Sequence, residues 1–176
     1  MIKTLQYTLS LIVFFALVSN ADKPVYIAGN LNGHGYEIIP TPMPWHLAKK
    51  KANDLGGYLV TISSAEENEF VISLINKATK GEMCEIWIGF NDERNEGDWK
   101  WVNAEKATYN CWHKFQPDNW NNGENAAVFV KNDQGYYWND RATDTRLPFI
   151  VEFNTTVDGD NRNDSGDAKS GLRSTR

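Results

Sequence analysis

The spacing of apolar residues in this chain changes abruptly near residue 80, and this change restricts the folds that it can adopt. Before that point, apolar residues recur at the spacing of an amphipathic helix, as in Trp45, Ala48, Ala52 and Leu55. After it, they form short runs rich in β-branched and aromatic residues, separated by long segments of Asn, Asp and Gly. Two helices followed by small strands and long loops indicate an α+β domain.

Local end signals define the two predicted helices. Pro44 stands where the first helix can begin, and Gly56-Gly57 can end it. Ser64, followed three residues later by Glu67, forms a capping box in which the glutamate reaches back to the start of the second helix. The buried stripe of this helix is expected to comprise Phe70, Val71, Leu74 and Ile75.

Six other segments are predicted to be short strands because they are rich in residues that favour extended structure. Long loops inside a compact domain are usually functional, so the polar segments between the strands are the candidate binding regions. The predicted strands are residues 58–62, 86–90, 99–102, 127–130, 136–138 and 149–153.

The first residues have the pattern of a secretory signal peptide. Residues 1–21 begin with the positive charge of Lys3, continue with an apolar run over 9–18 and end in small residues. That run is shorter than the roughly 20 residues that cross a bilayer, which disfavours the alternative of a membrane anchor. We expect cleavage after Ala21 and a secreted, extracellular protein without membrane insertion.

Composition separates the remainder into a domain and a tail. Residues 154–176 contain almost no large apolar side chain, so they are predicted to be a disordered polar tail. Residues 22–153 are expected to form one domain. The net charge of -5 argues against nucleic acid or anionic lipid as the main partner and is compatible with a set of cation ligands.

Several sequence blocks carry a family resemblance. In chain order they read GGYLVTISSAEENEF, WIGFNDERNEGDWKWV, QPDNW, GEN, WND and PFIVEF. Together they resemble a C-type lectin domain covering residues 34–153. The resemblance implies two helices flanking small antiparallel sheets, with a long loop that carries a calcium site.

The chain departs from this family in its cysteines. The resemblance implies two disulfides, but the four expected positions hold Ala52 with Val151 and Ala126 with Thr143. Core packing must therefore replace both bridges. The two cysteines present, Cys84 and Cys111, lie elsewhere; an even pair in an oxidising compartment suggests a bridge, and the alternative is two separate thiols.

Two loops contain the ligand set that the resemblance assigns to calcium. Ca²⁺ takes about 6 to 8 oxygen ligands, and five side-chain oxygens with one backbone carbonyl would leave room for two hydroxyls of a sugar. The resemblance also implies a cis peptide bond before Pro117. The alternative is a polar surface loop shaped by turn-forming residues. The expected metal ligands are Gln116, Asp118, Glu124, Asn139 and Asp140.

The order Gln-Pro-Asp resembles the galactose-type version of this motif. Trp120 stands where galactose-type relatives carry an aromatic ring that stacks on the sugar; the alternative is that it packs onto its own loop. Trp87, Trp99, Trp101 and Trp138 are expected in the core. The expected sugar-binding set is Gln116, Asp118, Trp120, Glu124 and Asn139.

A second calcium site is a further expectation from the resemblance. Some relatives hold an accessory ion at the positions of Asp92 and Glu96, together with Glu124. Asn119 and Asn125 stand where those relatives have acids, so the loss of two charges should weaken binding here.

Enzyme chemistry is not favoured by the sequence. The chain has only three histidines and no nucleophile motif beside them. Asp118 and Asp140 could be imagined as a glycosidase pair, but calcium would hold both carboxylates ionised. A calcium-dependent lectin that binds galactose-type glycans is therefore predicted, and a homo-oligomer would supply avidity. The alternative is a binder of ice or of mineral or matrix with the same fold.

Overall fold

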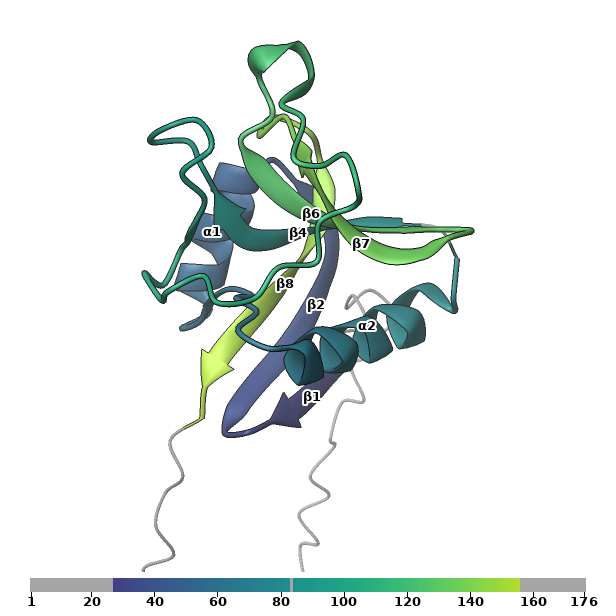
Figure 1. Ribbon diagram of the computed structural model, residues 1–176. Coiled ribbons are helices and arrows are strands. Elements are labelled where there is room, and N and C mark those ends of the chain that lie inside the picture. Colours follow the sequence, from purple (N-terminus) through teal and green to yellow (C-terminus); the bar gives the residue numbers. More distant parts are fainter. Residues whose placement is uncertain (1–26, 83, 156–176) are drawn as a thin grey trace, which may run out of the picture.

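The computed structural model describes residues 27–82 and 84–155 (Figure 1). The expected signal peptide lies outside the described residues, as does the expected tail from residue 156. Asn154, placed in that tail by its composition, instead pairs with His34 in the sheet. The elements are β1 (Ile27–Leu31), β2 (His34–Met43), α1 (Trp45–Asp54), β3 (Tyr58–Leu59), α2 (Ala65–Thr79), β4 (Cys84–Asn91), β5 (Lys100–Trp101), η1 (Trp120–Asn122), β6 (Ala126–Asn132), β7 (Gly135–Arg141) and β8 (Leu147–Asn154).

The strands join into one twisted sheet with the order β1-β2-β8-β4-β6-β7. The short strand β3 pairs with β8, and β5 pairs with β4. The named strands pair in antiparallel fashion except for one parallel bridge between β4 and β8, at Trp87 and Phe149, and Trp112 forms an isolated parallel bridge with Trp138 of β7. The α+β prediction is confirmed, although the expected small sheets are connected to one another.

The β1–β2 hairpin is an element that the sequence analysis does not predict. Its turn residues, Asn32 and Gly33, have φ angles of 50° and 85°. Two consecutive residues with positive φ are typical of a type I′ turn, whose twist matches that of the flanking strands. The dipeptide Asn-Gly is the local signal that could have revealed this hairpin.

Both helices begin where the sequence places them. Pro44 is the N-cap of α1, and the Ser64 side chain accepts a hydrogen bond of 3.2 Å from the backbone N–H of Glu67 in α2. The Glu67 side chain, the other half of the expected capping box, has different hydrogen-bond partners from those predicted. The Glu67 carboxylate accepts from the backbone N–H of Ser63 at 2.8 Å and from the hydroxyl of Tyr36 at 2.7 Å, so it ties α2 to β2.

Two hydrophobic clusters hold the helices to the sheet. Val71 of α2 packs in the larger cluster with residues from β2, β4 and β6. Trp45 of α1 packs in the second, where Ala52 and Val151 are both fully buried, as packing in place of a disulfide requires. The tryptophan prediction is confirmed for Trp87, Trp101 and Trp138, whereas Trp99 is only partly buried.

The expected bridge between Cys84 and Cys111 is wrong, and both thiols are free. The backbone N–H of Trp138 in β7 donates to the carbonyl of Cys111 at 2.7 Å, so Cys111 lies alongside β7. Cys84 begins β4. The strands β6 and β7 therefore separate Cys84 from Cys111 in the sheet. Three strand spacings amount to roughly 14 Å, about twice the largest Cα separation that a disulfide tolerates.

Gly57 offers a test of how closely the segment after α1 approaches β8. A Cβ atom at this position would lie 2.3 Å from the carbonyl oxygen of Glu152 and 2.8 Å from a methyl group of Val151. We predict that Gly57→Ala lowers the free energy of unfolding by about 3 kcal/mol, because backbone must move to relieve the overlap. Urea denaturation measures the loss. Gly123→Ala is the control, since the nearest atom there is 4.0 Å away; an equal loss in both variants would contradict the prediction.

Candidate metal and ligand site

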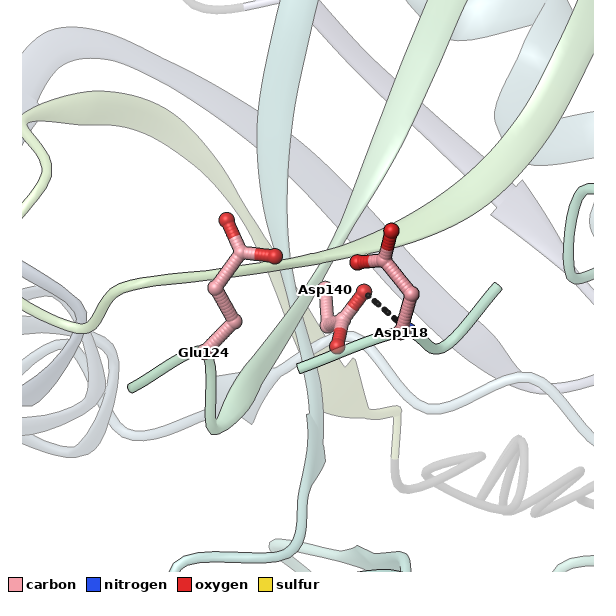
Figure 2. Close-up of side chains that lie close together, drawn as sticks. All are labelled: Asp118, Glu124 and Asp140. Carbon is pink, nitrogen blue, oxygen red and sulfur yellow. Dashed lines mark hydrogen bonds between the residues drawn. The ribbon is translucent and has the colours of Figure 1, made fainter. Parts of the chain in front are cut away.

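Three carboxylates converge at one end of β6 and β7. Oxygen atoms of Asp118, Glu124 and Asp140 all lie within 4.8 Å of one another (Figure 2). Asp118 and Glu124 both come from the long connection between β5 and β6, and Glu124 lies two residues before β6. Asp140 arrives from β7, where it pairs with Ala127 in the antiparallel ladder. The fold therefore gathers acids from two segments that the sequence separates.

Asp140 anchors the loop that carries the other two acids. Its side chain is fully buried and accepts hydrogen bonds from the backbone N–H groups of Asp118 at 3.3 Å and Asn119 at 2.7 Å. The side-chain oxygen of Gln116 also accepts from the backbone N–H of Asp118, at 3.0 Å. The peptide bond between Gln116 and Pro117 is cis, as the resemblance implies.

The asparagines of this loop have a structural role. Asn119, Asn121 and Asn122 all have positive φ angles, of 47°, 57° and 53°. Asparagine adopts this left-handed conformation more readily than most residues. The resulting turn is closed by two hydrogen bonds, from Glu124 N–H to the Asn119 side chain at 3.0 Å and from Trp120 N–H to the Glu124 carboxylate at 3.3 Å.

The electrostatics of the cluster favour a bound cation. Burial and the nearby charge of Asp140 raise the pKa of Glu124, while Arg141 acts in the opposite direction. The side-chain oxygen of Asn139 is buried and accepts no hydrogen bond from the described part of the chain. A hard divalent cation would relieve the repulsion between the acids and supply the partner that this oxygen lacks. The residues present therefore fit a calcium ion.

Arg141 is a member of the site that the sequence analysis does not identify. Its guanidinium donates to the carboxylate of Glu85 at 2.5 Å and 3.1 Å, and to Glu124 at 3.5 Å. It thus restrains Glu124 from the neighbouring strand. Its spacing of two residues from Asn139 in β7 is the signal that could have identified it, because side chains two apart in a strand lie on the same face.

The second set of expected calcium ligands lies beside the first. Asp92 is buried, and one of its carboxylate oxygens has no hydrogen-bond partner among the described residues. Glu96 is exposed and accepts a hydrogen bond of 2.5 Å from the Asn119 side chain. Asn125 contacts Asp92 through its backbone carbonyl, at 3.2 Å. Asn119 therefore serves as a neutral donor to Glu96, where a carboxylate would repel it.

Trp120 projects from this loop into solvent. Its side chain is 67% exposed, so it presents a planar surface beside the carboxylate cluster and does not pack away onto its own loop. Phe115, which directly precedes Gln116, is also exposed.

Comparisons with known proteins relate this chain to one domain family. The family model described as Lectin C-type domain matches residues 41–153. A perlucin-like protein from Mytilus galloprovincialis is 41% identical over 111 residues, which cover 62% of this chain and 69% of the relative. The alpha-N-acetylgalactosamine-specific lectin of Patiria pectinifera is 28% identical over 129 residues, covering 71% of this chain and 77% of that lectin.

A solved structure shares the fold. The crystal structure of the C-type lectin CEL-I from Cucumaria echinata superposes with a TM-score of 0.66 at 27% identity, covering 77% of this chain and 99% of that protein. The match confirms the fold that the resemblance implies, with its two helices and connected strands.

The pKa of Glu124 leads to a prediction about calcium binding. Because burial and Asp140 raise this pKa above the usual 4.5, protons compete with the cation at a higher pH than for a free carboxylate. We predict that calcium affinity falls between about pH 7 and about pH 5. Titration with calcium at both values measures the change. Glu93→Gln, outside the cluster, should leave the trend unaltered; equal affinity at the two pH values would contradict it.

Asn119 leads to a prediction about the number of ions. Asn119→Asp replaces the donor to Glu96 with a third charge beside Asp92, so we predict that the variant binds one more calcium ion than the natural chain. Isothermal titration calorimetry gives the stoichiometry. The control is Asn122→Asp, which adds the same charge to the same loop. A second ion that is already bound by the natural chain would refute the prediction.

Proposed function

This chain belongs to the C-type lectin domain family, and from that premise we propose that it binds carbohydrate through a calcium ion, with a preference for galactose or N-acetylgalactosamine. Family membership also confirms the prediction that it is a binding protein and not an enzyme. The observation that carries the proposal is the convergence of carboxylate oxygens of Asp118, Glu124 and Asp140 within 4.8 Å of one another.

The chain's own residues supply both halves of the hydrogen bonding that a sugar needs. When bound, calcium would offer coordination positions to two adjacent hydroxyl groups. Each hydroxyl could then donate to a carboxylate, Asp118 or Glu124, and accept from an amide, Gln116 or Asn139. The raised pKa of Glu124 fits this role, because the carboxylate gains from a neighbouring cation.

Two features support the galactose preference. The amide of Gln116 precedes the carboxylate of Asp118, which is the galactose-type order of the motif. The ring of Trp120 is exposed, so we expect it to stack on the apolar face of galactose. The Patiria pectinifera relative is named as specific for alpha-N-acetylgalactosamine, which agrees with this choice of sugar.

The predicted setting is extracellular. We propose that residues 1–21 direct secretion and that the domain of residues 22–153 binds free or cell-surface glycans, without nucleic acid as a partner. In the part of the chain that the structure describes, no helix is long and apolar enough to cross a membrane. A single site for a simple sugar is usually weak, so we expect a homo-oligomer to provide avidity.

Affinity chromatography tests the proposal. We expect the secreted chain to be retained on galactose-agarose with calcium and released by EDTA or by free galactose. Retention on mannose-agarose alone would keep the calcium site and reject the sugar preference. Failure to bind either resin, with calcium binding confirmed by a thermal shift, would redirect the assignment to ice or to mineral or matrix.

Variants test the roles of individual residues. Asp118→Ala and Asn139→Ala should abolish retention without unfolding, because each removes a ligand. Trp120→Ala should weaken galactose binding about tenfold through the loss of stacking. Exchanging the motif, with Gln116→Glu and Asp118→Asn, should shift preference toward mannose. Calcium-dependent galactose binding that survives Asp118→Ala would show that the site is assigned incorrectly.

A further inference from the structure

A hollow lies against the connection between β4 and β5. Its volume is about 440 Å³, within the range of roughly 300–1,000 Å³ that is usual for ligand pockets. Lys49 of α1 lines one side, and residues of the β4–β5 connection, including Arg94, line the other. A ring nitrogen of His46 lies 2.8 Å from a carboxylate oxygen of Glu93, and this contact joins α1 to the connection.

Cationic side chains from three places meet around this hollow. Lys49, Arg94 and Lys100 all line it. Lys100 is paired with Asp98 at 2.5 Å. No ion pair found in residues 27–82 and 84–155 involves Lys49 or Arg94. The ammonium of Lys49 lies 5.2 Å from the centroid of the Trp45 ring, a contact that leaves its charge uncancelled, so neither Lys49 nor Arg94 is neutralised by an acid of the described residues.

The lining also contains two carboxylates, Asp92 and Asp98, and Asp98 is paired with Lys100. Glu93, next to Arg94 in the chain, is paired with His46. Asp92 also lines the hollow, but it is only 2% exposed and accepts a hydrogen bond from the backbone N–H of Gly97 at 2.8 Å. Because Lys100 offsets Asp98, the charges of Lys49 and Arg94 exceed the charge of Asp92 by one among the lining side chains, on a chain whose net charge is -5.

Polar amides complete the lining. The side-chain N–H of Asn91 donates to the carbonyl of Lys100 at 3.1 Å, which fixes the amide at the wall, and Asn95 lies on the same connection. The indole of Trp101 is buried beneath them as a rigid floor. Lysine, arginine and amide groups together suit an oxyanion carried on a polar ligand.

The connection between β4 and β5 is shared by this hollow and the calcium site. One of its residues, Glu96, accepts the hydrogen bond from Asn119 of the calcium-site loop. Other residues of the same connection, Arg94 and Asn95, line the hollow. A glycan held at the calcium site could therefore extend across this connection and place a further group in the hollow.

We propose that the hollow lined by Lys49 and Arg94 binds the oxyanion of an acidic glycan, a sulfate ester or a carboxylate, whose terminal sugar occupies the calcium site. The inference rests on the proposed function, because the terminal sugar of the same glycan is expected to occupy the calcium site. It adds a preference for acidic over neutral galactose polymers, which the calcium site alone does not provide.

The test compares three immobilised polymers: a sulfated galactan, its desulfated counterpart and a polygalacturonate. Binding is measured in calcium for the natural chain and for the double variant Lys49→Gln/Arg94→Gln. We expect the natural chain to favour the sulfated over the desulfated polymer about fivefold, from two added ion pairs. The double variant should lose this preference while binding the desulfated galactan as before. The polygalacturonate shows whether a carboxylate can replace the sulfate.

A matched control separates the hollow from general charge attraction. Lys51→Gln/Lys106→Gln removes the same charge from exposed positions outside the hollow. An equal loss of preference in this control, or no loss in the double variant, would overturn the proposal. Thermal denaturation verifies that both variants are folded.

The same experiment in EDTA distinguishes the two proposals. If the natural chain fails to bind desulfated galactan in calcium, the proposed binding of galactose at the calcium site is wrong. The hollow is still supported if binding of sulfated galactan in EDTA depends on Lys49 and Arg94 and not on the control lysines. If both chains bind every polymer equally in EDTA, the hollow has no role.

Discussion

The register between β6 and β7 is the constraint on which the binding face depends. Ala127 lies opposite Asp140, and Val128 lies opposite Asn139. A shift of one residue would move the Asp140 carboxylate to the other face of the sheet. The loop would then lose the hydrogen bonds that its backbone N–H groups donate to Asp140, and these bonds hold the neighbouring acids in place. The buried apolar residues of both strands fix this register, so the packing of the core positions the charged site.

The loop holds its acids together by hydrogen bonds to backbone and amide groups. Asp140 accepts from two loop N–H groups, and Asn119 links Glu96 to the backbone of Glu124. Arg141 restrains Glu124 from the adjacent strand. Three carboxylates within 4.8 Å would repel one another in the absence of such contacts. The site is thus arranged before a cation arrives, which reduces the cost of ordering the loop on binding.

The core shows how the described part of the domain is held together without a disulfide. Ala52 and Val151 are buried in one cluster with Trp45, whose indole N–H donates to the carbonyl of Ile88 at 2.9 Å. Burial of large aromatic side chains with satisfied polar groups contributes stability that does not depend on the redox state of the surroundings. The free thiols of Cys84 and Cys111 are partly buried in the other cluster and act as small apolar residues.

The sequence by itself determined the local structure and the chemical inventory. Helix starts at Pro44 and Ser64, most of the strands and the oxygen-rich loops follow from spacing and turn chemistry, which depend on near neighbours. The tertiary structure alone decided which groups meet: the partner of Glu67, the separation of the cysteines, the contact of Arg141 with Glu124 and the hollow beside Lys49. These contacts depend on strand order and register, which are set by packing between residues far apart in the chain.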